Sequence, residues 1–286
     1  MKKILWFVII TIAVISPAAP NTGPKGILFA IGGGRRPDAM MKKFIELAQQ
    51  HKSGRIVVLP MASSVPQEVG PEQAEQFRLL GADKVEYHIL SPQDVMKPDT
   101  AALFDDAGGV FFSGGVQSRL ADLLMGTVVH QKLKTIFHRG AVIGGTSAGA
   151  AVMSAMMITG DENFADENDS FATIQADNIV TSAGLGFTQS VIIDQHFIRR
   201  KRHNRLISLI LENPDKLGIG IDESTAAVIF PDQIFTVLGE RNVIVYDAAE
   251  AVVDQGPGRA LAGYRVLMHV LKPGDRYNLN TRRIVK

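Results

Sequence analysis

The sequence predicts an α/β fold with a mostly parallel sheet, helices on both faces and an antiparallel extension toward the C-terminus. In the first two thirds, short unbroken apolar runs alternate with amphipathic stretches, a pattern typical of parallel strands covered on both faces. In the last third, short alternating runs are separated by Pro-Asp and Gly-Glu turns, which favours antiparallel strands. Hydrophobic residues make up 46% of the 286 residues, which is enough for a substantial core.

The first expected strand, residues 27–31, ends in three glycines and precedes an expected helix over residues 37–50. This unit then repeats. Further parallel strands are expected at residues 55–59, 85–90, 109–112, 141–144 and 191–193. Further helices are expected at residues 71–80, 117–125, 150–157 and 197–211, and antiparallel strands at 226–230, 234–238 and 242–246. We expect function in the loops after the parallel strands, because ligands bind beyond their carboxyl ends.

The N-terminus has the features of a secretory signal. Two lysines precede an apolar run over residues 4–15, and small residues follow at 16–19. The run is shorter than the roughly 20 residues that a permanent membrane helix needs, so no stable membrane anchor is expected. We therefore expect a signal peptide at 1–19, one α/β domain at 26–286 and a secreted or periplasmic protein. The alternative is an uncleaved anchor.

The charge balance and the cysteine count exclude several kinds of function. Lys and Arg total 30 against 29 Asp and Glu, so the net charge of +1 offers no global attraction for nucleic acid. The absence of cysteine excludes disulfides, thiolate metal sites and a cysteine nucleophile. No H-E-x-x-H motif or histidine cluster occurs, so neither a metal nor another cofactor is expected.

A nucleophile motif follows the expected strand at 141–144. Gly145-Thr146-Ser147-Ala148-Gly149 fits G-x-S-x-G, in which a serine occupies a strained strand-to-helix turn between glycines that avoid clashes. Ser147 is the candidate nucleophile, and the N–H group of Ala148 is a candidate oxyanion donor at the helix start. The alternative is an ordinary junction of small residues.

A serine nucleophile needs a base, and the base needs an acid to orient it. Of the seven histidines, His196 alone follows an apolar strand at its carboxyl end, the edge where Ser147 is expected. Glu223 ends the apolar run at 217–221 and is the preferred acid, with Asp194 as its rival. The resulting order of Ser, His and Glu differs from the Ser, acid, His order of α/β-hydrolases, which argues against an esterase of that fold.

A second oxyanion donor is expected from another glycine-rich loop. The segment at 113–117 follows the strand at 109–112, and Gly115 permits close approach of its backbone to a reacting carbonyl. Gln117 is positioned to orient a substrate. The alternative is a plain turn.

Together these motifs resemble the cyanophycinases of serine peptidase family S51, which have a class I glutamine-amidotransferase-like fold. The resemblance covers residues 26–230 and is most specific at residues 145–150, 194–197 and 220–223. It implies a serine exopeptidase that cuts cyanophycin, a poly-aspartate with arginine on each β-carboxyl group, into β-Asp-Arg dipeptides. It also implies a possible homodimer.

The resemblance assigns a role to each matching residue. Ser147, His196 and Glu223 match the triad, and the residues that match the family's substrate contacts are Gln117, Asp194, Gln195, Arg200, Arg202 and Arg205. Val116 and Asn204 depart from the family pattern, which puts the fine substrate preference in doubt. On charge alone, the arginines would attract substrate carboxylates, and the acidic residues at 161–169 would meet guanidinium groups. The alternative for both segments is a solvated surface.

Three other functions compete with this interpretation. An aspartyl dipeptidase of the same family would share the triad and have a smaller pocket. The glycines at 32–34 suggest a dinucleotide-binding module, but Pro37 replaces the third glycine of the fingerprint and no acid follows the second strand. A catalytically inactive binding protein would need a broken triad, whereas all three members are present.

Overall fold

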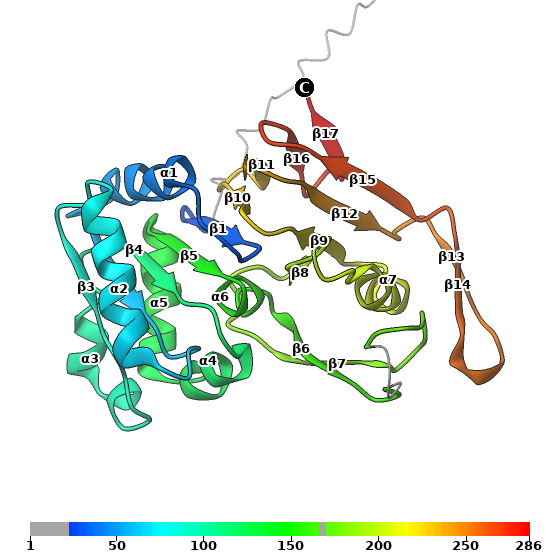
Figure 1. Ribbon diagram of the computed structural model, residues 1–286, viewed down its shortest axis with the longest axis horizontal. Helices are drawn as coiled ribbons and strands as arrows, with labels where there is room; N and C mark the ends of the chain where they lie inside the picture. Colours follow the sequence, from blue (N-terminus) through cyan, green and yellow to red (C-terminus); the bar gives the residue numbers. More distant parts are fainter. Residues whose placement is uncertain (1–22, 166–169) are drawn as a thin grey trace, which may run out of the picture.

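The computed structural model describes residues 23–165 and 170–286 and contains a central mixed sheet flanked by helices (Figure 1). The expected signal peptide lies outside the described residues, as do Asp166, Glu167 and Asp169 of the acidic segment. In the part of the chain that the structure describes, no helix is both long and apolar enough to span a bilayer.

The central sheet confirms the predicted fold class. Its parallel part has the order β1 (Ile27–Ile31), β5 (Val142–Thr146), β4 (Ala107–Phe112), β2 (Arg55–Leu59) and β3 (Val85–Tyr87). On the other side of β1 the antiparallel strands are β10 (Thr225–Ile229), β11 (Ile234–Gly239), β16 (Arg276–Asn278) and β17 (Arg283–Val285). The parallel strands are therefore extended by antiparallel ones, as the sequence pattern predicts.

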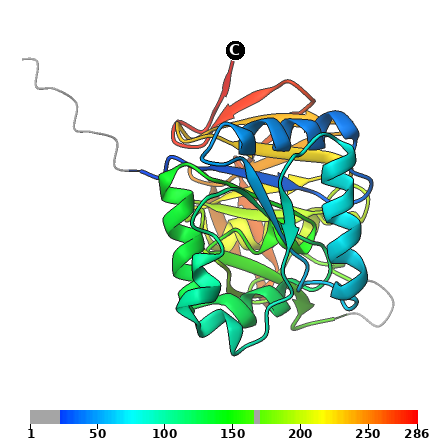
Figure 2. The same ribbon diagram turned by 90° about the vertical axis from the view of Figure 1, so that its left-hand side faces the viewer.

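Helices cover both faces of this sheet. The helices in the described part of the chain, including α7 on the second sheet, are α1 (Asp38–Gln49), α2 (Pro66–Leu79), α3 (Pro98–Ala102), α4 (Gln117–Leu124), α5 (Val128–Arg139), α6 (Ala148–Ala151) and α7 (His203–Glu212), with short 3₁₀ turns at Asp94–Met96 and Pro257–Arg259. Alternate residues of β1 face opposite sides: Phe29 packs edge-on against Phe44 of α1, whereas Leu28 joins the core beside α5. Figure 2 shows α2 and α5 on opposite sides of the strands between them.

A second sheet has the order β15 (Leu267–Leu271), β12 (Val243–Asp247), β9 (Leu217–Ile221) and β8 (Val191–Gln195), with β8 parallel to β9. The sequence interpretation placed both β8 and the strand expected at 242–246, which is β12, in the same sheet as β5, and this is wrong. Helix α7 packs directly on β9, because Gly218 has no side chain and a Cβ there would lie 2.7 Å from Ile210 Cγ1. An apolar run indicates that a strand is buried, but it does not identify the strand with which that strand pairs.

Two hairpins extend from the main body: β6 (Met156–Glu162) with β7 (Ile179–Ala183), and β13 (Val252–Gln255) with β14 (Leu261–Tyr264) (Figure 1). Two predicted helices are corrected here. The helix expected at 150–157 is only the short α6, and the chain enters β6 at Met156. The helix expected at 197–211 starts at His203, because residues 197–202 form turns in which Lys201 has a φ of 52° that no α-helix accommodates.

Candidate active site

The residues at the carboxyl end of β1 connect the central sheet to the second sheet through backbone hydrogen bonds. Three successive carbonyl groups accept backbone hydrogen bonds there: Ile31 from Ser147 N–H at 2.9 Å, Gly32 from His196 N–H at 2.6 Å, and Gly33 from Ser224 N–H at 2.9 Å. Ser147 and His196 directly follow β5 and β8, and Ser224 lies in the turn between β9 and β10. The candidate nucleophile, base and acid are thus held together although His196 follows a strand of the second sheet.

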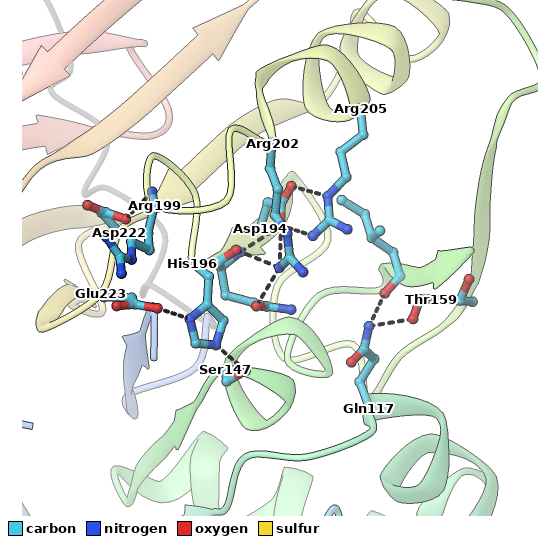
Figure 3. A network of polar contacts seen from close by, with 12 residues as sticks. Gln117, Ser147, Thr159, Asp194, His196, Arg199, Arg202, Arg205, Asp222 and Glu223 are labelled. Atoms are coloured by element: carbon cyan, nitrogen blue, oxygen red, sulfur yellow. Dashed lines mark hydrogen bonds and ion pairs between the residues drawn. The ribbon is translucent and has the colours of Figure 1, made fainter. Parts of the chain in front are cut away.

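Ser147, His196 and Glu223 form a continuous chain of side-chain hydrogen bonds (Figure 3). Ser147 Oγ lies 2.9 Å from His196 Nε2, and His196 Nδ1 lies 2.7 Å from Glu223 Oε1. In the neutral imidazole, Nδ1–H donates to the carboxylate and Nε2 accepts the serine hydroxyl proton. This geometry is the one that a general base requires to activate a serine nucleophile.

The nucleophile turn has the strained backbone that the G-x-S-x-G motif predicts. Ser147 has φ 53° and ψ −113° and directly precedes α6. A Cβ at Gly145 would lie 2.5 Å from the carbonyl carbon of Gly149, so this close approach requires glycine. His196 also has a positive φ, of 49°. Strain of this kind persists only where surrounding contacts enforce it, and it is concentrated at functional sites.

The glycines at 32–34 are explained by the triad rather than by a nucleotide. A Cβ on Gly33 would lie 2.5 Å from His196 Nε2, and one on Gly34 would lie 2.8 Å from Glu223 Cβ. Both glycines also have positive φ values, of 105° and 69°. The absence of side chains here allows the imidazole and the carboxylate to approach β1.

Burial lowers the pKa of His196 below its ordinary value. The hydrogen bond to Glu223 opposes this effect and raises the pKa, while the positive charges of Arg200 and Arg202 add to the lowering. Because the net effect lowers the pKa of His196, the imidazole is neutral at neutral pH. His196 is therefore in the protonation state that can accept a proton from Ser147.

Asp194 and Arg205 form a buried ion pair behind the base. Arg205 Nε donates to Asp194 Oδ2 at 2.7 Å and Arg205 Nη2 donates to Oδ1, while the exposed fractions of the two side chains are 1% and 0%. Asp194 makes no hydrogen bond to the imidazole, whose partner is Glu223. The structure thus does not place Asp194 as the acid, and neither member of the pair is exposed to a substrate.

Arg202 ties this pair to the segment that carries the base. Its Nη1 donates to the backbone carbonyl and to the side-chain Oε1 of Gln195, both at 2.7 Å, and lies 3.8 Å from Asp194 Oδ1. Burial lowers the pKa of Arg202 to about 10, with a further contribution from Arg205. The side chain of Gln195, immediately before His196, is thus held by Arg202, and this contact uses the Oε1 of Gln195.

Arg200 and Gln117 lie in different surroundings. Arg200 is exposed in the turn after His196, and among the described residues its side chain has no hydrogen bond or ion pair. Gln117 is buried, and its Nε2 donates to the carbonyl groups of Ile158 and Thr159 at 2.9 and 2.6 Å (Figure 3). Of the six expected substrate contacts, Arg200 is the side chain most available to a ligand.

The expected oxyanion donors flank the nucleophile. Ala148 follows Ser147 at the start of α6, and a Cβ at Gly114 would lie 3.5 Å from Ser147 Cβ, so the loop at 113–117 passes beside the serine. Gly115 has φ 139°, and a Cβ there would lie 2.5 Å from the carbonyl carbon of Ala62. The conformation of this loop therefore depends on glycine.

A cavity of about 250 Å³ adjoins Ser147 on the side of the glycine turn and α2. Its lining includes Arg36, Glu72 and Gln73, which the sequence interpretation missed. The position of Arg36 could have indicated a binding residue, because Arg36 follows the first strand at the sheet edge where ligands are expected. Nothing in the sequence indicated Glu72 and Gln73, since polar residues on an amphipathic helix usually face the solvent. Within residues 23–165 and 170–286, no group of three or more metal-ligating side chains is found.

The sequence matches peptidase family S51 over residues 28–237. The cyanophycinase of Synechococcus elongatus is 34% identical over 276 residues, which cover 92% of this chain and 82% of that protein. The cyanophycinase of Trichormus variabilis is 35% identical over 236 residues, covering 80% of this chain and 77% of that protein. A peptidase from an acI-B1 Actinobacterium has the same fold, with a TM-score of 0.66, 23% identity and coverage of 90% and 98%. The match to the family covers most of the chain and includes the serine turn and the end of β8, so the chain belongs to peptidase family S51 and is a serine-type peptidase.

Proposed function

We propose that the chain hydrolyses cyanophycin to β-Asp-Arg dipeptides by a Ser-His-Glu mechanism. The observation that carries the mechanism is the hydrogen-bonded series of Ser147, His196 and Glu223 at 2.9 and 2.7 Å. The support for the substrate is the similarity to cyanophycinases over most of the chain.

In the proposed reaction, Ser147 Oγ attacks the scissile carbonyl carbon while His196 Nε2 takes the hydroxyl proton. Glu223 keeps Nδ1 protonated and stabilises the imidazolium that forms. The N–H groups of Ala148 and Gly115 stabilise the negative charge on the carbonyl oxygen. His196 then gives its proton to the leaving amine, and water hydrolyses the acyl-enzyme with His196 again acting as the base.

Arg200 is the proposed first contact for the polymer's free carboxylates. Its guanidinium is exposed in the turn next to the base, and its charge acts on the imidazole. Guanidinium groups bind carboxylates bidentately, which suits a poly-aspartate chain whose termini and arginine residues carry carboxylates. The buried members of the expected contact set, Asp194 and Arg205, are assigned instead to positioning of the segment before His196.

The signal-like N-terminus supports export to the periplasm or beyond the cell, where the enzyme would act on released polymer. N-terminal sequencing of the protein from cell fractions tests this proposal, with a start between residues 19 and 26 as the expected result. The possible homodimer is tested by the mass of the purified protein in solution.

Mass spectrometry of the products formed from insoluble cyanophycin tests the proposed function. The expected product is the β-Asp-Arg dipeptide, formed by the wild type and not by the Ser147→Ala variant. Hydrolysis of free aspartyl dipeptides without release of soluble products from the polymer would instead support the aspartyl dipeptidase.

A further inference from the structure

The cavity beside Ser147 has unused hydrogen-bonding capacity in its wall. Gln73 is only 4% exposed, lines the cavity, and its Oε1 is buried without a hydrogen-bond partner among the described residues. A buried acceptor without a partner costs free energy, which a ligand that donates to it would recover.

Glu72 provides a second free acceptor on the same wall. Its carboxylate is exposed on α2, and in the described part of the chain it has no hydrogen bond or ion pair. Glu72 and Gln73 both line the cavity, one with an exposed carboxylate and the other with a buried amide oxygen. A ligand that carries a positive charge and several hydrogen-bond donors would suit both groups.

Arg36 places a positive charge in the same cavity. Its Nε and Nη2 donate to Gln76 Oε1 at 3.1 and 2.9 Å, which fixes the guanidinium and leaves its other N–H groups available. Burial lowers the pKa of Arg36, and the charge of Glu72 partly offsets this. The cavity therefore holds a fixed cation, an exposed carboxylate whose charge acts on that cation, and the buried Oε1 of Gln73.

We propose that this cavity is the subsite for one arginine residue of the substrate, next to the bond that Ser147 attacks. The substrate guanidinium, with five N–H donors, would bind the Glu72 carboxylate and Gln73 Oε1, and the arginine's free α-carboxylate would face Arg36. The volume of about 250 Å³ is below the roughly 300–1,000 Å³ of sites for drug-sized ligands, which suits one side chain rather than a whole dipeptide. The inference rests on the proposed function, because it assigns a part of the cyanophycin repeat to the cavity.

Calorimetric binding to the inactive Ser147→Ala variant tests the subsite without requiring turnover. The probes are β-Asp-Arg and its neutral analogue β-Asp-citrulline. Adding Glu72→Gln should weaken β-Asp-Arg binding about fivefold and leave β-Asp-citrulline binding unchanged, since the contact is a partly exposed charge pair.

Glu68→Gln is the matched control. Glu68 is exposed one turn earlier on the same helix, does not line the cavity, and loses the same charge when substituted. Equal effects of the two substitutions, no effect of Glu72→Gln, or no preference for arginine over citrulline would overturn the subsite.

Polymer hydrolysis by the wild type is measured separately, so that the two proposals can fail independently. Discrimination that depends on Glu72, without release of dipeptides from cyanophycin, would support the subsite and overturn only the proposed function. Release of dipeptides at the wild-type rate by Glu72→Gln, with unchanged binding, would overturn only the subsite.

Discussion

Replacing Arg205 by methionine separates a positioning role from substrate contact. Asp194 and Arg205 are buried, and the carboxylate would lose two hydrogen bonds from the guanidinium. It would keep the Gln195 N–H at 2.7 Å and the Arg202 cation at 3.8 Å.

Removing one partner of a buried ion pair typically costs 3–5 kcal/mol, and the remaining partners of Asp194 put the expected cost at about 3 kcal/mol. For a chain of this size that corresponds to a fall in Tm of about 5 °C. Circular dichroism recorded during thermal unfolding measures this change in Tm. Asp194→Asn combined with Arg205→Met removes both charges and should restore most of the stability.

Arg200→Met is the control, because an exposed arginine without an ion pair should change the Tm by no more than about 2 °C. If Arg205 instead bound substrate directly, Arg205→Met would raise KM and leave the Tm unchanged. That result would refute the assignment of the buried pair to positioning.

Four further predictions concern the triad. The acid limb of kcat/KM should lie below pH 6.5, because burial lowers the pKa of His196, and Arg200→Met should move that limb to higher pH by removing a nearby positive charge. The contribution of His196 to folding stability follows the same direction: it is complete above pH 6.5 and is lost as the pH falls below that value, which urea unfolding at several pH values measures. Gly33→Ala should lower kcat at least about 100-fold, because its Cβ would displace the imidazole, whereas Gly81→Ala, at a similar φ but with nothing within 4 Å, should keep near wild-type kcat in steady-state assays. Glu223→Gln should lower kcat by roughly 10²–10⁴-fold with little change in KM, and an unchanged kcat would exclude it as the acid.

Much of the central sheet could be predicted from the sequence. The apolar runs predicted β1 and β2 with the observed bounds, because strands buried on both faces leave an uninterrupted hydrophobic signal. The G-x-S-x-G motif placed Ser147 in a strained turn before a helix, since the glycines are required by local sterics. Both features depend on neighbours in the sequence.

The features that were missed depend on contacts between distant segments. Arg205 sits in a run of basic residues that looks solvated, and nothing local indicates that Asp194 removes it from water. Likewise, β8 has the pattern of any buried strand, and only its pairing with β9 places it in the second sheet. Gln73 on α2 reaches the nucleophile cavity through tertiary packing alone.

Covalent labelling tests the central claim, that His196 activates Ser147 as the nucleophile. The protein is incubated with a fluorophosphonate, which reacts with activated serine hydroxyls, and the modified peptide is located by mass spectrometry. A single adduct on Ser147, lost in the His196→Ala variant, is the predicted result. An active enzyme that carries no adduct on Ser147, or a His196→Ala variant that is labelled at the wild-type rate, would contradict it.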